Sequence, residues 1–484
     1  MQMIYGVKDR PKAGQLILFA LQQLLAILAA TITVPIVINN NPLCANANMS
    51  ISAALFGAGA GTIVYLLFTK FKSPVFLGSS FAFLGSMAAA FYGGVSAALG
   101  NLGLIIGAAF AGLVYVIISV IVKFAGVKWI DKVMPAVVIG PTVAIIGLSL
   151  AGSAVSQFAG GITDPDTGAY VMGVHGILSV VCGVVTLATT IACSVYGKKL
   201  LKMIPFVVGI LAGYVVAAIF TAFSYIEGAE AMRIIDFTAF TRMEWYPNFA
   251  FLQMISDDYG TGTVGSIGAY IGTIAVAYIP VAFVVFAEHI ADHKNISSII
   301  GQDLLTDPGL SKTLLGDGIG SMAGAVFGGC PNTTYGESVG CVAISGNASV
   351  ITIFVTACMA IVCAFIAPFV TFLSTIPACV MGGVCVALYG FIAVSGLKMI
   401  QKTDLGENRN LFVVSVVLIV GVGGMALQFG KVTVTAVASA LILGILTNLF
   451  VNIKNKKSEG EQLTIDEATK TVVAEEEENA DEKL

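Results

Sequence analysis

The sequence predicts an all-α polytopic membrane protein. Its 484 residues are 57% hydrophobic and only 11% charged, whereas soluble domains carry about 25% charged residues. Mean hydropathy is +0.93. Apolar stretches recur along almost the whole chain, and a bilayer core of roughly 30 Å needs about 20 such residues per helix. The N-terminus has no short apolar region followed by a small-residue cleavage site, so we expect no removable signal peptide.

Fourteen segments are expected to cross or enter the membrane. In order they are 16–38, 50–69, 75–91, 97–121, 135–153, 176–196, 203–224, 265–291, 311–328, 334–345, 348–370, 376–397, 410–429 and 434–452. Segments three and ten are short or irregular, because Gly, Ser, Thr and Pro residues lie in or beside their apolar runs. Interrupted segments of this kind are typical of ligand sites in transporters.

The basic residues support this count and orient the chain. With the N-terminus inside, all but three of the 24 Lys and Arg residues fall on the cytoplasmic side, the exceptions being Arg233, Arg242 and Lys431. This asymmetry follows the positive-inside rule. We therefore expect a multi-pass protein of the cell membrane with cytoplasmic N- and C-termini. Residues 454–484 are rich in acids and are expected to form a disordered cytoplasmic tail.

Two similar heptapeptides indicate an internal repeat. Met134-Pro135-Ala136-Val137-Val138-Ile139-Gly140 opens segment five, and Ile376-Pro377-Ala378-Cys379-Val380-Met381-Gly382 opens segment twelve. Seven segments separate the two, so the copies have opposite orientations. This predicts a 7+7 inverted repeat whose irregular third and tenth segments meet near the midplane. The alternative is that Pro and Gly recur at helix starts in membrane proteins without any repeat.

Acidic residues inside the spans are the candidates for function. Glu288 and Glu337 lie within predicted spans, and Asp292 follows Glu288 by one helical turn on the same face. An ionised acid at mid-membrane costs on the order of 2.5–3.5 kcal/mol, so such acids are usually paired, protonated or functional. For Asp317, near the start of span nine and close to Lys312, a structural cap and a function within the span both stay open, and His289 and His293, near the inner end of span eight, could each be a simple interfacial histidine.

Glu337 directly follows Gly336 at the start of a short predicted helix. Free backbone N–H groups at a helix start can donate hydrogen bonds to a ligand, while the carboxylate can accept them. The stretch 329–338 is therefore interpreted as half of a ligand site.

Enzymes and channels are disfavoured by what the sequence lacks. It has no metal-spaced His cluster, no Gly-x-Ser-x-Gly elbow and no Walker loop, and its nine cysteines show no metal-like spacing. A channel would be expected to repeat a pore motif. We expect no catalytic residues, no metal, no cofactor and no nucleic-acid partner.

Several motifs together resemble the nucleobase–ascorbate transporter (nucleobase:cation symporter 2) family, and within it the uracil permeases. They cover nearly the whole chain, and the pair Ala287-Glu288-His289 and Asn332-Thr333-Thr334-Tyr335-Gly336-Glu337 is the most specific. The remaining matches are Gly6-Val7, Arg10-Pro11, Ala30-Thr31, Pro35, Leu77 to Phe83, Asp303-Leu304-Leu305, Asp307 to Leu310, Pro377 and Met381-Gly382-Gly383.

The resemblance implies a fold and a function. It implies fourteen helices in an inverted repeat, with short antiparallel strands in segments three and ten. A core domain (1–126 and 261–371) would move against a gate domain (127–260 and 372–453), in a homodimer surrounded by membrane lipid. It implies uracil import by proton symport.

The resemblance also implies site residues. Glu288 and Glu337 would bind the pyrimidine together with the backbone amides of Phe81 and Gly336, and Tyr335 would line the pocket. We expect Glu288 to carry the proton, coupled to His289 or Asp292.

Two departures leave alternatives open. Gln22-Gln23 stands where the family usually has Gln-His, and Asp292 stands where many uracil permeases have a second His and purine permeases tend to have an acid. Xanthine or urate is therefore the alternative substrate. An anion transporter of the same architecture would need a net positive pocket, whereas the charges inside these spans are acidic.

Overall fold

The computed structural model describes residues 3–126, 135–164, 166–198, 200–256, 259–429 and 432–452. Three predicted features lie outside the described residues: the acidic tail 454–484, the first residues of the gate domain (127–134), and Met134 of the first repeated heptapeptide. The helices are α1 (Ala13–Asn39), α2 (Ile51–Phe68), α3 (Leu84–Ala89), α4 (Ala97–Ala125), α6 (Ala136–Ser149), α7 (Ala151–Phe158), α8 (Val174–Tyr196), α9 (Leu200–Met203), α10 (Pro205–Phe223), α11 (Ala250–Gln253), α12 (Ile267–Ile300), α13 (Leu310–Gly328), α14 (Gly336–Ser345), α15 (Val350–Cys363), α16 (Ala367–Ser374), α17 (Ala378–Gln401), α18 (Asn408–Val422) and α19 (Ala436–Val451). The strands are β1 (Leu77–Ser79), β2 (Asn332–Thr334), β3 (Leu427–Phe429) and β4 (Val432–Val434).

The prediction of a polytopic helical membrane protein is confirmed. Within the described residues, eight helices are long and apolar enough to cross a bilayer, and α15 with α16 adds a ninth if this pair, bent by 83°, is one span. Helices α18 and α19 are shorter and also apolar.

Three predicted segments differ from the observed elements. Segment 348–370 is divided between α15 and α16, and segment 135–153 is divided between α6 and α7. Segment 410–429 ends early as a helix, because α18 stops at Val422 and the chain turns into the hairpin β3–β4. The glycines Gly423 and Gly424 follow α18, and Gly424 has a φ of 68°, which favours glycine and ends the helix.

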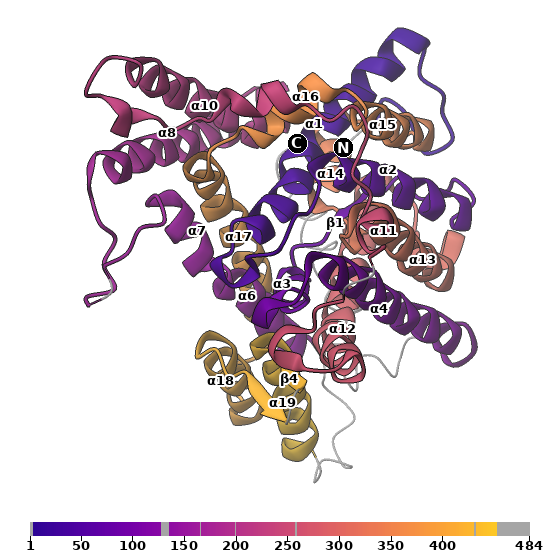
Figure 1. Ribbon diagram of the computed structural model, residues 1–484. Helices are drawn as coiled ribbons and strands as arrows, with labels where there is room; N and C mark the ends of the chain where they lie inside the picture. Colours follow the sequence, from indigo (N-terminus) through magenta and orange to yellow (C-terminus); the bar gives the residue numbers. More distant parts are fainter. Residues whose placement is uncertain are drawn as a thin grey trace.

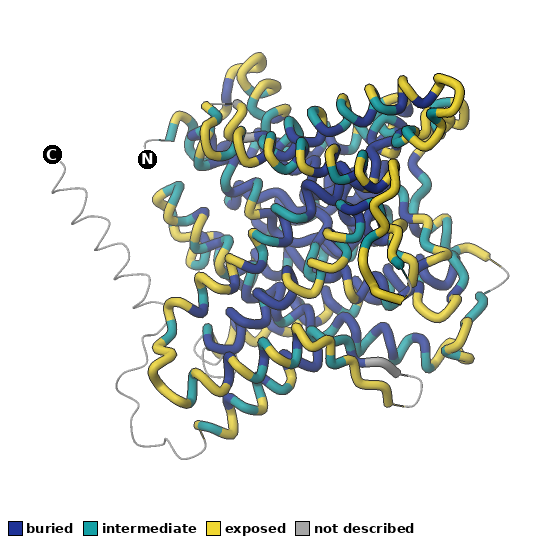
Figure 2. Tube along the Cα trace, turned by 90° about the vertical axis from the view of Figure 1, so that its left-hand side faces the viewer, coloured by how far each residue is buried: buried dark blue, intermediate teal, exposed yellow. Residues whose placement is uncertain are grey.

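The helices pack in two neighbourhoods (Figure 1). In one, α2 lies against α13 and α15, and α4 lies against α12 and α13. In the other, α17 packs on α6, α7 and α8, while α18 packs on α19 and α6. Figure 2 shows buried residues concentrated in the middle of the molecule and exposed residues around its periphery.

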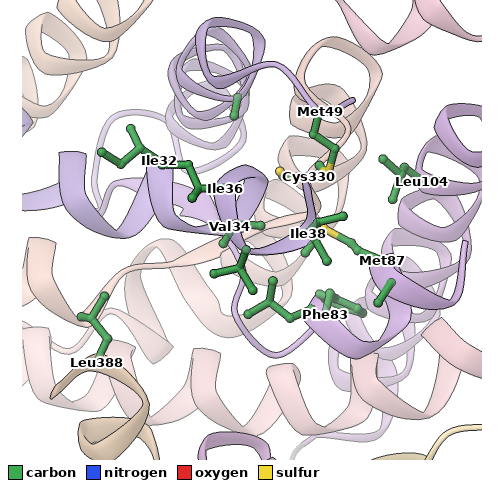
Figure 3. Close-up of a cluster of buried hydrophobic side chains, with 14 of the residues drawn as sticks. Ile32, Val34, Ile36, Ile38, Met49, Phe83, Met87, Leu104, Cys330 and Leu388 are labelled. Atoms are coloured by element: carbon green, nitrogen blue, oxygen red, sulfur yellow. The ribbon is translucent and has the colours of Figure 1, made fainter. Parts of the chain in front are cut away.

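Two short strands pair in the interior of the molecule. β1 and β2 pair antiparallel, with Leu77 opposite Thr334, Gly78 opposite Thr333 and Ser79 opposite Asn332. Both strands are buried. β1 lies in predicted segment three, whereas β2 ends at Thr334, the first residue of predicted segment ten, so the two short strands that the resemblance implied are present, the second of them just before its predicted segment. Buried apolar side chains from α1, including Val34 and Ile38, pack with Phe83, Met87 and Cys330 beside these strands (Figure 3).

Glycines allow α2 and α13 to approach closely. A Cβ atom at Gly61 of α2 would lie 2.6 Å from the carbonyl oxygen of Gly320, and one at Gly320 of α13 would lie 2.7 Å from that of Gly61. Small residues at such seams let two helix backbones touch within a membrane protein. The Gly-Ala repeat at 57–61 thus lies in a close helix seam.

We expect Gly61→Val to destabilise the protein by about 1–3 kcal/mol, because the new side chain would force apart two packed backbones. Thermal unfolding in nanodiscs measures this effect. Gly268→Val is the matched control, since a Cβ atom there meets nothing within 4 Å. Equal unfolding midpoints for the two variants would contradict the close seam.

An exposed ion pair joins the segment after α2 to the turn before α13. Lys72 Nζ lies 2.6 Å from Oδ1 and 2.8 Å from Oδ2 of Asp307. These hydrogen bonds lower the pKa of the Asp307 carboxyl. A carboxyl whose pKa is lowered by folding adds stability above its ordinary pKa and loses it as the pH falls through the lowered value.

Asp307→Asn should therefore lower the melting temperature slightly at pH 7, and the difference from wild type should shrink below about pH 4. The effect is small because 55% of the Asp307 side chain is exposed. Melting curves of both proteins across this pH range measure it. A difference that grows in acid would contradict the assigned pair.

Candidate functional site

The antiparallel pair β1–β2, called the ribbon below, leads into two short helices, α3 and α14. Both helices pack against α12. Ser80 N–H donates to the Pro331 carbonyl at 2.9 Å, and Tyr335 N–H donates to the Phe76 carbonyl at 3.2 Å. These bonds fix the turns that lead into α3 and α14. α12 packs against both β2 and α14, so its polar face meets the first turn of α14.

Three predicted acids lie together at this junction. Glu288 and Asp292 come from α12, and Glu337 is the second residue of α14. Asp292 lies one helical turn from Glu288 on the same face of α12, and its Oδ1 is 4.0 Å from the position of a Cβ atom at Gly336, the residue before Glu337. Thr334 of β2 donates its hydroxyl hydrogen to Asp292 Oδ2 at 2.6 Å, which fixes that side chain beside the ribbon.

The two glutamates remain available to a ligand. Glu288 and Glu337 are half-buried, and neither belongs to an ion pair of the described residues. Gly336, between Tyr335 and Glu337, is exposed, and a Cβ atom there would have only Asp292 Oδ1 within reach, at 4.0 Å. Open space therefore borders the backbone at the start of α14.

The predicted aromatic residues occupy two different positions. Phe81 is half-buried and its ring meets that of Tyr389 of α17 edge-on, with centroids 6.0 Å apart. Tyr335 is buried, and its hydroxyl donates to the Ser79 carbonyl at 2.9 Å. A Cβ atom at Gly78 would overlap the Tyr335 ring. Tyr335 therefore packs against the ribbon and is hydrogen-bonded to it, while the Phe81 ring contacts α17.

Gln23, where the sequence departs from the family pattern, ties α1 to α14. Its Nε2 donates to Ser338 Oγ at 2.5 Å and to the Ser338 carbonyl at 3.3 Å. The Phe76 N–H also donates to Ser338 Oγ, at 3.3 Å. Ser338 follows Glu337, so these bonds hold the first turn of α14 against α1 and the residue before β1.

The structure contradicts a cap role for Asp317 and an interfacial position for His289 and His293. α13 begins at Leu310, so Asp317 lies within the helix and is no cap. Both histidines are fully buried. His289 Nδ1 lies 2.6 Å from Asp317 Oδ2, and His293 Nε2 lies 2.7 Å from the Tyr65 hydroxyl.

His289 therefore faces α13 rather than Glu337. In the sequence, His289 and His293 are four residues apart, on a helix face next to that of Glu288 and Asp292. This spacing could have indicated a second row of polar side chains on α12.

Comparison with known proteins agrees with the architecture and the motifs. Residues 14–430 match the Xan_ur_permease model of the Permease family. The uracil permease of Bacillus caldolyticus is 37% identical over 452 residues, covering 93% of this chain and 94% of the relative. That of Bacillus subtilis (strain 168) is 36% identical, covering 92% and 94%.

A solved structure shares the fold at low sequence identity. The transmembrane domain of the cyanobacterial bicarbonate transporter BicA superimposes with a TM-score of 0.59 at 13% identity, covering 91% of this chain and 99% of that one. The family match and the curated relatives extend over most of the chain. This chain therefore belongs to the permease family of nucleobase–ascorbate transporters, and it is a transporter rather than an enzyme.

Proposed function

We propose that this protein imports uracil together with a proton. The observation that carries the proposal is the packing of α12, which carries half-buried Glu288, against α14, where half-buried Glu337 follows exposed Gly336. The curated relatives that bear the name uracil permease support the choice of base.

The chemistry of uracil fits the groups present. Its ring N–H groups would donate to the carboxylate of Glu337 and to the carbonyl oxygen of the protonated Glu288 carboxyl, and its carbonyl oxygens would accept from the backbone N–H groups of Phe81 and Gly336. The Phe81 ring offers a face for the flat base. A site built to pair a hydrogen-bonding edge rejects analogues that lack this edge by large factors.

Transport would proceed by alternating access. Residues 1–126 and 261–371 would form a core domain that carries the base, and residues 127–260 and 372–453 a gate domain against which it moves. The separate packing of α2, α4, α12 and α13 and of α6, α7, α8 and α17 supports this division. We place fourteen segments in a 7+7 inverted repeat, both termini in the cytoplasm, and two copies in a homodimer.

Glu288 would take up the proton outside and release it inside, with Asp292 one turn away able to share it. Uptake of radiolabelled uracil into proteoliposomes, with and without an imposed pH gradient, tests the function. Accumulation only with the inward proton gradient is expected. No uracil uptake under either condition would refute the proposal.

Asp292 favours a second candidate substrate, a purine such as xanthine or urate. Its carboxylate reaches the ribbon at Thr334 and would offer one more acceptor to a larger base. Competition of labelled uracil by unlabelled xanthine and urate decides between the two: stronger competition by a purine than by uracil would reassign the substrate.

A further inference from the structure

A second polar cluster lies between α12 and α13, away from the pocket. His289 makes two contacts with α13: Nδ1 with Asp317 Oδ2 at 2.6 Å and Nε2 with Thr313 Oγ1 at 3.0 Å. All three side chains are buried, with 0–1% of each residue exposed. Both ring nitrogens are thus occupied, and a histidine in this setting holds either one or two ring protons.

The Thr313 hydroxyl can serve both protonation states. It lies 3.1 Å from the Leu310 carbonyl, to which it can donate, and 3.0 Å from His289 Nε2. With one proton between Nδ1 and Asp317, the hydroxyl donates to Nε2 and the cluster carries one negative charge. With a second proton on Nε2, the hydroxyl turns to the Leu310 carbonyl and accepts from Nε2, and the cluster is neutral.

We propose that Asp317, His289 and Thr313 form a second proton-binding site that does not touch the substrate. Loading adds one proton from water to Nε2 of His289, and unloading returns it to water. Apart from this proton, the two states differ only in the rotation of the Thr313 hydroxyl. This inference rests on the proposed function for its role in symport, but the proton binding itself does not depend on the substrate.

Neighbouring groups tie this site to the pocket. The charges of Glu288 and Asp292 on α12 interact with that of Asp317, and Glu288 also interacts with Glu337 of α14. A proton that neutralises the cluster removes a negative charge near the pocket acids, so loading favours the ionised carboxylate of Glu337 that would bind the base.

The remaining titratable neighbours limit the stacked pair His289 and His293 to one positive charge. The rings of His289 and His293 stack with centroids 4.0 Å apart, so protonation of one disfavours protonation of the other. His293 Nδ1 donates to the His289 carbonyl at 2.8 Å. Tyr65 of α2 contacts His293, and Tyr115 of α4 meets His289 edge-on at 6.2 Å.

Nitrogen NMR of histidine-labelled protein in nanodiscs tests the site without any substrate. The chain has only three histidines, and exposed His175 serves as an internal reference. We expect the His289 ring to gain its second proton as the pH falls. Thr313→Val leaves Nε2–H without an acceptor, so the midpoint should move about one pH unit toward acid, a tenfold loss of proton affinity.

Thr313→Ser keeps the hydroxyl and is the matched control, with the midpoint expected within a few tenths of a unit of wild type. Equal midpoints in all three proteins, or a His289 ring that keeps one proton from about pH 5 to 9, would overturn the proposal.

Transport separates this proposal from the proposed function. Asp317→Asn is expected to lower uracil accumulation driven by a pH gradient about tenfold or more, while uracil exchange at equal pH stays within about twofold of wild type. Wild-type accumulation in this variant would overturn the second site. Absence of uracil uptake by the wild-type protein would instead refute the proposed substrate, with the NMR result unaffected.

Discussion

Glu337→Ala is expected to abolish detectable equilibrium binding of uracil. The carboxylate is the proposed acceptor at the start of α14, where it follows exposed Gly336. A hydrogen bond to a charged group contributes about 1.5–3 kcal/mol, and its loss leaves the N–H of the base without a partner. The combined effect corresponds to about a hundredfold or greater loss of affinity.

Calorimetry or radioligand binding on purified protein measures this loss. Glu230→Ala is the matched control, because Glu230 is exposed in the segment between α10 and α12 and should leave binding unchanged. Wild-type affinity in Glu337→Ala would show that the base binds elsewhere.

Glu288→Gln is expected to eliminate uptake driven by a pH gradient. The amide keeps the size of the side chain and one acceptor oxygen but cannot exchange a proton at physiological pH. We expect pH-driven accumulation to fall about tenfold or more, and the response to an imposed gradient to disappear.

Proteoliposomes with an acidic exterior measure this variant against wild type and Glu230→Gln. Pyrimidine binding at equilibrium should be measured in parallel, because Glu288 is also expected to contact the base. Unaltered pH-driven uptake in Glu288→Gln would remove its role as proton carrier.

The sequence was most informative where local chemistry decides the structure. The four-residue spacing of Glu288 and Asp292 placed both on one face of a helix, and the structure has them on α12. The Pro, Gly and Thr residues around Asn332 indicated an irregular segment, and a short strand followed by a short helix is found there. Such features depend on residues close in the chain.

Features that depend on distant contacts were missed. Asp317 looked like a cap because Lys312 is near in sequence, but its partner His289 is 28 residues away on another helix. The hairpin β3–β4 was also missed, since an apolar run of the composition of 410–429 is compatible with a helix until the glycines after Val422 end it. Only the packing of whole helices decides these points.

The close approach of α2 and α13 has a consequence for handling the protein. Backbone touches backbone at Gly61 and Gly320, so this seam holds by shape and offers surfactant tails no gap to enter. The outward faces of α8 and α10 differ from this seam, because their apolar side chains are not covered by protein: Val184, Leu211 and Val215 are about half exposed. These faces depend on lipid or surfactant chains to cover them. Harsh, short-chained surfactants should therefore loosen the periphery first and leave the glycine seam intact.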